Sequence, residues 1–479
     1  MPTKFLTSFT ALSLALMTLT GCQTSLSTRP VSELPPGVSG IWQSNGYGYV
    51  LDVTEEYPRL FHHTSEFCIE DKETAAALSY YLTPSNLTFS SDGNAFYFSP
   101  TLEDYTIELQ AISKPPQTCG LEIASDPITV FESFASYMTE HYAFFDLYGV
   151  DWDNAVKEAR HDISSTTSES ELLDIIEALI APIKDGHLSL QAEVGGKERV
   201  LNPGQSSVGN ALKRIAEREG ASRQKLNNKM MRQYWMSDVK RDILEGEGKM
   251  TADDMIQFGI VSGDIGYIAI ASEAGYAGKG LFFEEADLAV LQDTLGTAIS
   301  TFNEASAKAV IIDLSVNFGG YDFISREIAG RFATERALAY TKYASDSSNQ
   351  TPFEIYVEPD SSERYTGHVI LVTSNVTVSA GEMLTMALRA QPNVTHVGEA
   401  TRGAHSDVLE KRLPNGWTLN LSNEIYHDHD GEFWEGRGIP PHIPMQIFNP
   451  DNPFEGHVDA INSVIEQIDT GSFPFKQNK

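Results

Sequence analysis

The chain has little positive charge. Of its 479 residues, 34 are Lys or Arg and 66 are Asp or Glu, which gives a formal net charge of -32. Such a charge repels nucleic acid and excludes a basic nucleic-acid groove or any broad phosphate-binding face. The acidity fits either solubility in a salty habitat or a preference for positively charged substrates, and composition does not separate the two.

Cysteine is also scarce, and metal-ligand spacings are missing. The three cysteines are Cys22, Cys68 and Cys119, and neither a paired-cysteine motif nor a His-Glu-x-x-His motif occurs. His427 and His429 lie in an acidic stretch, but without such spacing a solvated loop is the better interpretation than a metal site. We therefore assign no metal and no cofactor.

Long apolar runs are missing from the sequence. Hydrophobic residues nevertheless make up 41% of the chain, which is enough to form the cores of two or three domains. After Lys4, an apolar stretch from Phe5 to Leu19 has the pattern of a secretory signal and is too short to span a membrane. The ending Leu19-Thr-Gly-Cys22 resembles the bacterial lipoprotein cleavage box. The resemblance implies lipidation of Cys22, and Gln23 after it implies sorting to the outer membrane, facing the periplasm.

Export places the other two cysteines in an oxidising compartment. A disulfide between Cys68 and Cys119 is then expected, with two free buried thiols as the alternative.

The first sign of a catalytic site is a predicted strand, a polar turn and a helix that starts at Ser379. The segment reads His368-Val-Ile-Leu-Val-Thr-Ser-Asn-Val-Thr-Val-Ser379-Ala-Gly-Glu-Met. A helix start carries free N–H donors and partial positive charge, which stabilise an oxyanion beside the hydroxyl. A serine there is also a common N-cap.

Two further segments favour catalysis over capping. A buried-type strand from Ala309 runs into Gly319 and Gly320, whose backbone N–H groups can approach a ligand closely. An amphipathic helix ends at Asp185-Gly186, and His187 begins an alternating strand, where a histidine is well placed as a base.

Together these segments resemble the serine peptidase family of C-terminal (tail-specific) processing peptidases, the tricorn core protease and interphotoreceptor retinoid-binding protein. The resemblance covers about residues 126–444 and rests on four ordered motifs. They are Asp313-Leu-Ser-Val-Asn317-Phe-Gly319-Gly320, with Ser315 where the family has arginine, Thr377-Val-Ser379-Ala380-Gly-Glu382, Gly398-Glu-Ala-Thr401-Arg-Gly403 and Glu435-Gly436-Arg437-Gly438-Ile439-Pro-Pro441.

The resemblance also selects the base. Tail-specific members have a lysine where this chain has Ala404, whereas tricorn-like members use a histidine in a segment similar to Asp185-Gly186-His187. A glutamate at the position of Glu435 completes the relay, although the serine that links the two in tricorn is replaced by Gly186. The chain is thus closest to the tricorn-like, non-lysine branch.

Acyl transfer requires the same set of groups. Ser379 would act as nucleophile, His187 would accept its proton, and Glu435 would fix the imidazole. The N–H groups of Gly319 or Gly320 and of Ala380 are the candidates for the oxyanion hole, each contributing on the order of 3 kcal/mol to lowering the barrier. His405, just past the glycine loop, could approach the same site.

The sequence divides into six parts. An α/β fold is expected, with a crotonase-like layered peptidase core as the resemblance implies, a helical N-terminal subdomain and a small preceding β-rich domain. The parts are a signal peptide with lipobox (1–22), a tether (23–38), a β-rich domain (39–118), a helical subdomain ending in the His-bearing strand (126–200), a polar helical insertion (201–258) and the α/β peptidase core (259–470).

These observations predict a cell-envelope lipoprotein serine peptidase that acts on peptides or unfolded proteins and is held to the membrane by its lipid anchor. One alternative is a catalytically inactive ligand- or peptide-binding protein on the same scaffold. Another is a hydrolase of non-peptide esters or amides. No peptide-binding PDZ pattern is found in residues 191–258, and the oligomeric state is unknown.

Overall fold

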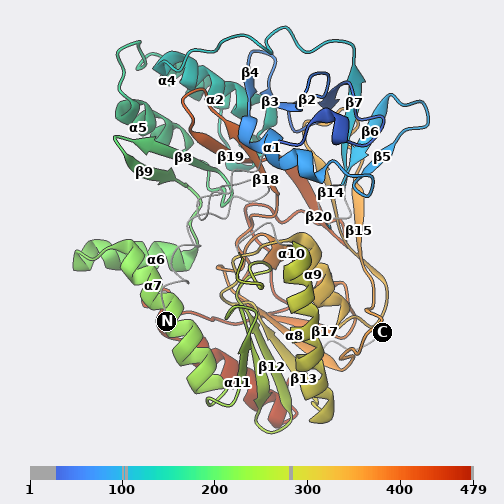
Figure 1. Cartoon of the computed structure of the whole chain (residues 1–479). Helices are drawn as coiled ribbons and strands as arrows, with labels where there is room; N and C mark the ends of the chain where they lie inside the picture. Colours follow the sequence, from blue (N-terminus) through green and yellow to red (C-terminus); the bar gives the residue numbers. More distant parts are fainter. Residues whose placement is uncertain (1–27, 100–101, 103–105, 280–283, 476–479) are drawn as a thin grey trace.

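The computed structural model describes residues 28–99, 102, 106–279 and 284–475 (Figure 1). The chain is mixed α/β, as expected. The expected signal peptide with Cys22, and the first residues of the tether, lie outside the described residues. Within the described ranges, no helix combines the length and apolar character needed to cross a membrane.

The N-terminal module is an antiparallel sheet with one helix, drawn in blue in Figure 1. The strand order is β4-β3-β2-β1-β7-β6-β5. The elements are β1 Ile41–Ser44, β2 Tyr49–Asp52, β3 Arg59–His63, β4 Cys68–Glu70, α1 Lys72–Tyr81, β5 Leu87–Phe89, β6 Ala95–Phe98 and β7 Ile107–Ile112. Cys68 and Cys119 form a disulfide with a Cα–Cα distance of 4.7 Å, which ties β4 to the segment after β7.

The helical subdomain follows, and its helices begin at capping residues. The elements are α2 Pro127–His141, α3 Phe145–Tyr148, α4 Trp152–Arg160, α5 Glu169–Ile180, β8 Ser189–Val194 and β9 Lys197–Leu201. Asp126 accepts hydrogen bonds from the first turn of α2, and Ser168 forms a capping box with Glu171 at α5. β8 also pairs with β19 (Thr418–Ser422), which pairs with β18 (Val408–Arg412), so distant residues complete this subdomain.

The insertion is helical and packs on the core. It contains α6 Ser207–Glu219, α7 Arg223–Arg232 and a π-helix Gln233–Ile243, followed by β10 Lys249–Thr251 and β11 Ile256–Val261. Tyr234 and Trp235 of the π-helix are buried against the central sheet. β10 and β11 are the first strands of that sheet.

The central sheet has the order β10-β11-β12-β13-β16-β17-β21, and its strands from β12 onward are parallel. These strands are β12 Ile265–Ile270, β13 Ala309–Asp313, β16 His368–Thr373, β17 Val394–Gly398 and β21 Ile443–Pro444. β12 and β13 are nearly all apolar because side chains of both faces are buried.

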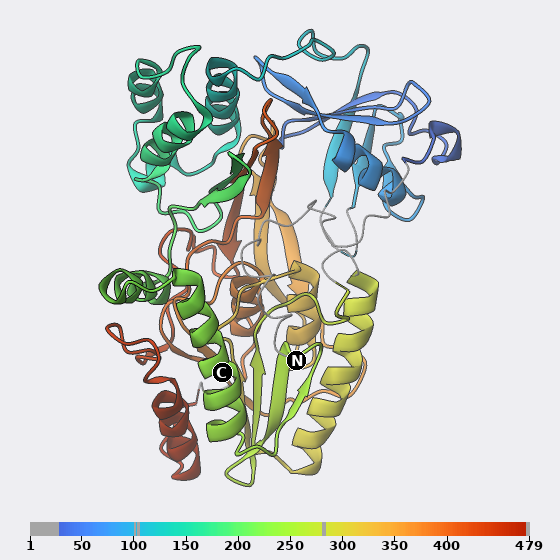
Figure 2. The ribbon, with the colours of Figure 1, turned by 60° about the vertical axis from the view of Figure 1, so that its left-hand side comes forward.

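Helices cover the two faces of this sheet (Figure 2). On one face lie α8 Glu284–Glu304, α9 Asp322–Gly330 and α10 Ala380–Arg389, and on the other lie the π-helix and α11 His457–Asp469. A third sheet has the order β15-β14-β20, with β14 Ala337–Ala344, β15 Phe353–Val357 and β20 Glu424–Asp428.

The topology brings two predicted site segments together. β13 and β16 are parallel neighbours, with Asp313 opposite Val372. Their carboxyl ends therefore meet at one edge, where β13 leads to Gly319 and β16 leads to Ser379.

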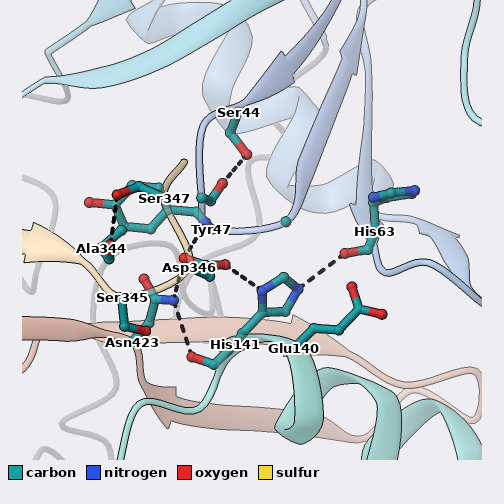
Figure 3. A network of polar contacts seen from close by, with 12 residues as sticks. Ser44, Tyr47, His63, Glu140, His141, Ala344, Ser345, Asp346, Ser347 and Asn423 are labelled. Carbon is teal, nitrogen blue, oxygen red and sulfur yellow. Dashed lines mark hydrogen bonds and ion pairs between the residues drawn. The ribbon is translucent and has the colours of Figure 1, made fainter. Parts of the chain in front are cut away.

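The N-terminal module, α2 and the third sheet meet at His141 (Figure 3). The His141 Nδ1 atom lies 2.6 Å from Asp346 Oδ2, and its Nε2 atom lies 3.1 Å from the His63 carbonyl oxygen. Asn423 Nδ2 donates to Asp346 Oδ1 and to the His141 carbonyl. The β-rich module is thus joined to the rest through buried polar contacts.

A buried ion pair joins α11 to the central sheet. His457 Nε2 lies 2.8 Å from Asp313 Oδ2, and Nδ1 lies 3.7 Å from Asp238 Oδ2. Burial alone lowers the pKa of His457, but the two carboxylates more than offset this and raise it to about 9. Ser315, which stands where the family has arginine, donates its N–H to Asp313, so the cation beside that carboxylate is His457.

We expect His457→Gln to destabilise the fold most below neutral pH. Because the pKa of His457 is raised in the folded state, its contribution is complete below the ordinary value of about 6.5 and is lost as pH rises through about 9. Denaturant unfolding should show a loss of about 3 kcal/mol at pH 6 and much less at pH 10. Exposed His161→Gln is the control, and an equal loss at both pH values would contradict the assignment.

Candidate active site

Ser379 lies in a strained turn between β16 and α10. Its backbone has φ 59° and ψ -130°, a conformation that costs a non-glycine residue on the order of 1–3 kcal/mol. The residue is partly exposed. Such strain in a serine at a helix start is typical of a nucleophile held out for reaction.

The buried carboxylate of Glu382 holds this turn. Its Oε2 atom accepts hydrogen bonds from the N–H groups of Ser379 at 3.2 Å and Ala404 at 2.9 Å, and Oε1 accepts from Gly403 N–H at 2.7 Å. The Ser379 N–H also donates to the Ala404 carbonyl at 3.2 Å. Glu382 therefore joins the nucleophile turn to the loop 401–405.

Backbone donors for an oxyanion lie beside Ser379. A Cβ built on Gly319 would stand 2.7 Å from the Ser379 Cβ and 2.9 Å from the Ala380 nitrogen. The Gly319 N–H is already bonded to Asn317 Oδ1 at 2.9 Å, whereas the N–H groups of Gly320 and Ala380 have no acceptor among the described residues. Of the two expected glycines, Gly320 is thus the one with a free donor.

Glu273, which the sequence did not single out, supports the glycine loop. Its N–H donates to the Gly319 carbonyl, its carbonyl accepts from Tyr321 N–H, and its Oε1 atom accepts from Asn317 Nδ2 at 2.7 Å. Burial raises the pKa of Glu273 to about 8 despite the bond from Asn317. This side chain is therefore mostly protonated at neutral pH.

His187 lies just before β8, beside the loop that holds Ser379. Gly186 packs on Ala404, because a Cβ at Gly186 would lie 3.0 Å from the Ala404 Cβ. Asp185 Oδ1 accepts the His187 N–H at 2.8 Å. The side chain is buried, and neither ring nitrogen has a hydrogen-bond partner in the described part of the chain.

A second histidine, His405, is enclosed by two carboxylates. Its Nε2 atom lies 3.3 Å from Glu382 Oε1, and its Nδ1 atom lies 3.5 Å from Glu435 Oε2. Burial alone lowers the pKa of His405, but Glu382 and Glu435 more than offset this, and the net shift is upward. The protonated form of this histidine is therefore favoured.

Glu435 comes to the same region but bonds to His405 and its neighbour. Its Oε2 atom accepts the N–H groups of His405 at 2.9 Å and Ser406 at 3.2 Å, while Oε1 has no partner among the described residues. Burial raises the pKa of Glu435, with His405 lowering it and Asp185 raising it again. No hydrogen bond joins Glu435 to His187 in the described structure, in contrast to the simple relay that the resemblance implies.

Other candidates lie apart from this cluster. Lys184, the lysine nearest to His187 in the sequence and so a candidate for a lysine base, is exposed, and its ammonium donates to the Ala181 carbonyl. His427 belongs to β20, and His429 lies 3.5 Å from Asp430. In the described part of the chain, no group of three His, Cys, Asp or Glu side chains is arranged to hold a metal ion.

Several residues around Ser379 have contacts in the structure that local sequence patterns do not predict. Glu382 follows Ser379 at the spacing of a capping box, which was a usable signal. Glu273 had no such signal, because its contacts with Asn317 and Gly319 are made across the sheet. The two-carboxylate environment of His405 likewise arises only from the fold.

We expect Gly319→Ala to abolish catalysis while the chain remains folded. The added methyl would collide with Ser379 and Ala380, and the φ of 78° disfavours alanine. Gly263→Ala is the matched control, since Gly263 has φ 84° and open space around it. Turnover of a peptide substrate and thermal unfolding should be measured for both; equal activity in the two variants would contradict the close packing described.

Known proteins share both the sequence pattern and the fold. Residues 264–445 match the model of peptidase family S41. The carboxy-terminal processing protease CtpA of Bacillus subtilis is 25% identical over 179 residues, which is 37% of this chain and 36% of that protein. The chain therefore matches about a third of the length of this curated relative.

Solved structures cover more of the chain. A protein from Parabacteroides merdae, described as a peptidase, is 25% identical with a TM-score of 0.56 over 72% of this chain and 97% of its own. Mature CPAF shares the fold, with a TM-score of 0.51, 12% identity and coverage of 72% and 98% of the two chains. These findings confirm the family resemblance: residues 264–445 match peptidase family S41, a family of serine-type hydrolases.

Proposed function

We propose that this chain is a serine peptidase that cleaves peptide bonds through an acyl-enzyme, with Ser379 as nucleophile and His187 as general base. The observation that carries the proposal is the strained Ser379 turn, which packs on Gly319, while the N–H groups of the adjoining Gly320 and Ala380 have no acceptor among the described residues. Preorganised donors next to a serine hydroxyl are the arrangement that stabilises a tetrahedral oxyanion. We also infer the crotonase-like layering of the core that the resemblance implies.

In the proposed reaction, Ser379 Oγ attacks the scissile carbonyl carbon while its proton passes to His187. The carbonyl oxygen becomes an oxyanion that accepts hydrogen bonds from Gly320 and Ala380. His187 then gives the proton to the leaving amine, and the C–N bond breaks. Water, deprotonated by the same histidine, hydrolyses the acyl-enzyme and regenerates Ser379.

The surroundings of the three candidate bases favour His187. A general base must be neutral before it accepts a proton. His405 is held between Glu382 and Glu435, and its raised pKa favours the protonated form. Lys184 is exposed and directed to a backbone carbonyl. The ring of His187 has no hydrogen-bond partner among the described residues, and the preceding Gly186 packs on Ala404 of the loop that binds Ser379.

Glu435 is the proposed third member of the relay. Its Oε1 atom has no partner among the described residues, so it has capacity to accept a hydrogen bond from a charged imidazole. Hydrogen bonds in apo active sites commonly tighten only when substrate is bound. In this proposal, Glu435 stabilises the imidazolium of His187 during the reaction.

Ser379→Ala should lower peptide turnover on the order of a millionfold and abolish labelling by a fluorophosphonate, because loss of the nucleophile removes the acyl-enzyme route. His187→Ala should be similarly damaging. Hydrolysis of an unfolded protein and fluorophosphonate labelling are the two measurements. Lys184→Ala is the control for the base, and His405→Gln tests the alternative histidine.

The outcomes separate the alternatives. Full activity in His187→Ala would refute the proposed base, and a loss confined to His405→Gln or Lys184→Ala would assign the role to that residue. If the wild type is never labelled and cleaves neither protein nor peptide, the chain is a binding protein on the peptidase scaffold. Cleavage of esters alone would identify a non-peptide hydrolase.

We further propose that the protein is a lipoprotein of the bacterial cell envelope, anchored to the outer membrane and facing the periplasm. The support is the N-terminal sequence, in which Lys4 and an apolar stretch precede Leu19-Thr-Gly-Cys22. Acyl chains on Cys22 would hold the folded part at the membrane surface, since each buried methylene contributes about 0.8 kcal/mol.

Cys22→Ser should leave the protein unacylated and shift it from the membrane to the soluble fraction. Radiolabelled fatty acid incorporation and fractionation measure the two effects. Cys68→Ser provides the control for loss of a cysteine elsewhere. Retention of the Cys22→Ser protein in the membrane fraction would show that another element anchors it.

A further inference from the structure

Arg402 lies within the candidate active site, but neither the reaction proposed above nor any of the four family motifs assigns it a role. Its backbone N–H donates to the Thr377 carbonyl at 2.8 Å, two residues before the nucleophile. Its side chain extends toward Gly186, since a Cβ there would lie 3.6 Å from Arg402 Cγ and 3.8 Å from Nη1. The backbone of Arg402 thus adjoins the Ser379 turn, and its guanidinium lies next to the residue that precedes His187.

This guanidinium has no ion-pair partner among the described residues. The Nε atom donates to the Asn375 carbonyl at 3.1 Å, which leaves the four N–H groups of the two terminal nitrogens without an acceptor in the described structure. The nearby carboxylate of Glu382 is already bound by three backbone N–H groups.

Arg402 differs in this respect from several other arginines of the chain. Acidic residues outnumber Lys and Arg by 66 to 34, and other arginines, such as Arg59 with Glu70 and Arg412 with Glu410, form ion pairs. Arg402 is only partly exposed, and burial lowers its pKa to about 10, with Glu382 opposing the shift. A desolvated cation of this kind gains much from a carboxylate that reaches it.

The planar guanidinium also has the geometry for a carboxylate. Its free edge presents parallel N–H donors that match the two oxygens of a carboxylate in a bidentate pair. The net charge of -32 discourages acidic ligands elsewhere on the surface, so the local preference at Arg402 differs from that of the whole molecule.

We propose that Arg402 is a specificity-determining residue that binds a carboxylate of the peptide substrate beside the scissile bond. The inference rests on the proposed peptidase function and deepens it by naming the substrate class. The carboxylate has two sources, an Asp or Glu side chain near the cleaved bond or the α-carboxylate of a peptide that ends just beyond it. Both supply the same bidentate acceptor.

Matched fluorogenic peptides distinguish the sources. One series replaces Gln by Glu at each position on either side of the cleaved bond, and a second series compares a free C-terminal carboxylate with its amide. We expect kcat/KM of the wild type to favour the carboxylate form at least tenfold at one position. Preference in the first series identifies a side chain, and preference in the second identifies a chain end.

Three variants test the residue itself. Arg402→Met should reduce the carboxylate-to-neutral ratio at that position to about one, and Arg402→Glu should reverse it in favour of a Lys-containing peptide. Lys184→Gln is the matched control, because it removes a positive charge three residues from His187 without touching the guanidinium. The control should keep the wild-type ratio.

The readouts keep the two proposals separate. Fluorophosphonate labelling of Ser379 and cleavage of a neutral peptide report on the peptidase function alone; if both are absent in the wild type, that function is wrong. If neutral peptides are cleaved but the wild type shows no carboxylate preference, or Arg402→Met retains it with normal labelling, the role of Arg402 is refuted. Circular dichroism confirms that each variant is folded.

Discussion

The carboxylate of Glu382 is the interaction on which the candidate site depends. Three backbone N–H groups, those of Ser379, Gly403 and Ala404, converge on its two oxygens inside the protein. A carboxylate at the start of α10 is also favoured by the helix dipole. These bonds stabilise the strained conformation of Ser379 and hold the loop 401–405 against it, so one side chain positions the nucleophile, Arg402 and His405 together.

The buried charges near the site differ in how they are compensated. His405 lies between two carboxylates and Asp313 lies beside His457, so each of these groups has its counter-charge within the fold. Paired charges of this kind are costly to break and stable once made. Arg402 has no such partner among the described residues, which is why a substrate carboxylate is the natural complement to it.

The site is assembled from three distant stretches of chain. Gly319 and Ser379 follow neighbouring parallel strands, whereas His187 is brought in because β8 pairs with β19. The polar contacts of His141 connect the same subdomain to the N-terminal module and to the third sheet. The helical subdomain therefore carries the proposed base, and the loops that follow strands of the central sheet carry the nucleophile and the oxyanion donors.

Local patterns in the sequence determined much of this protein: the apolar strands before Gly319 and Ser379, the capped helices, and the motifs that carry the family resemblance. Each depends on neighbouring residues and on periodicity, which a sequence displays directly. The tertiary structure alone decided that Gly319 N–H is bound by Asn317, that Glu273 is buried beside the glycine loop, and that Glu435 contacts His405 and not His187. These outcomes depend on desolvation and on hydrogen bonds between residues far apart in the chain, and neither quantity exists until the strands have paired.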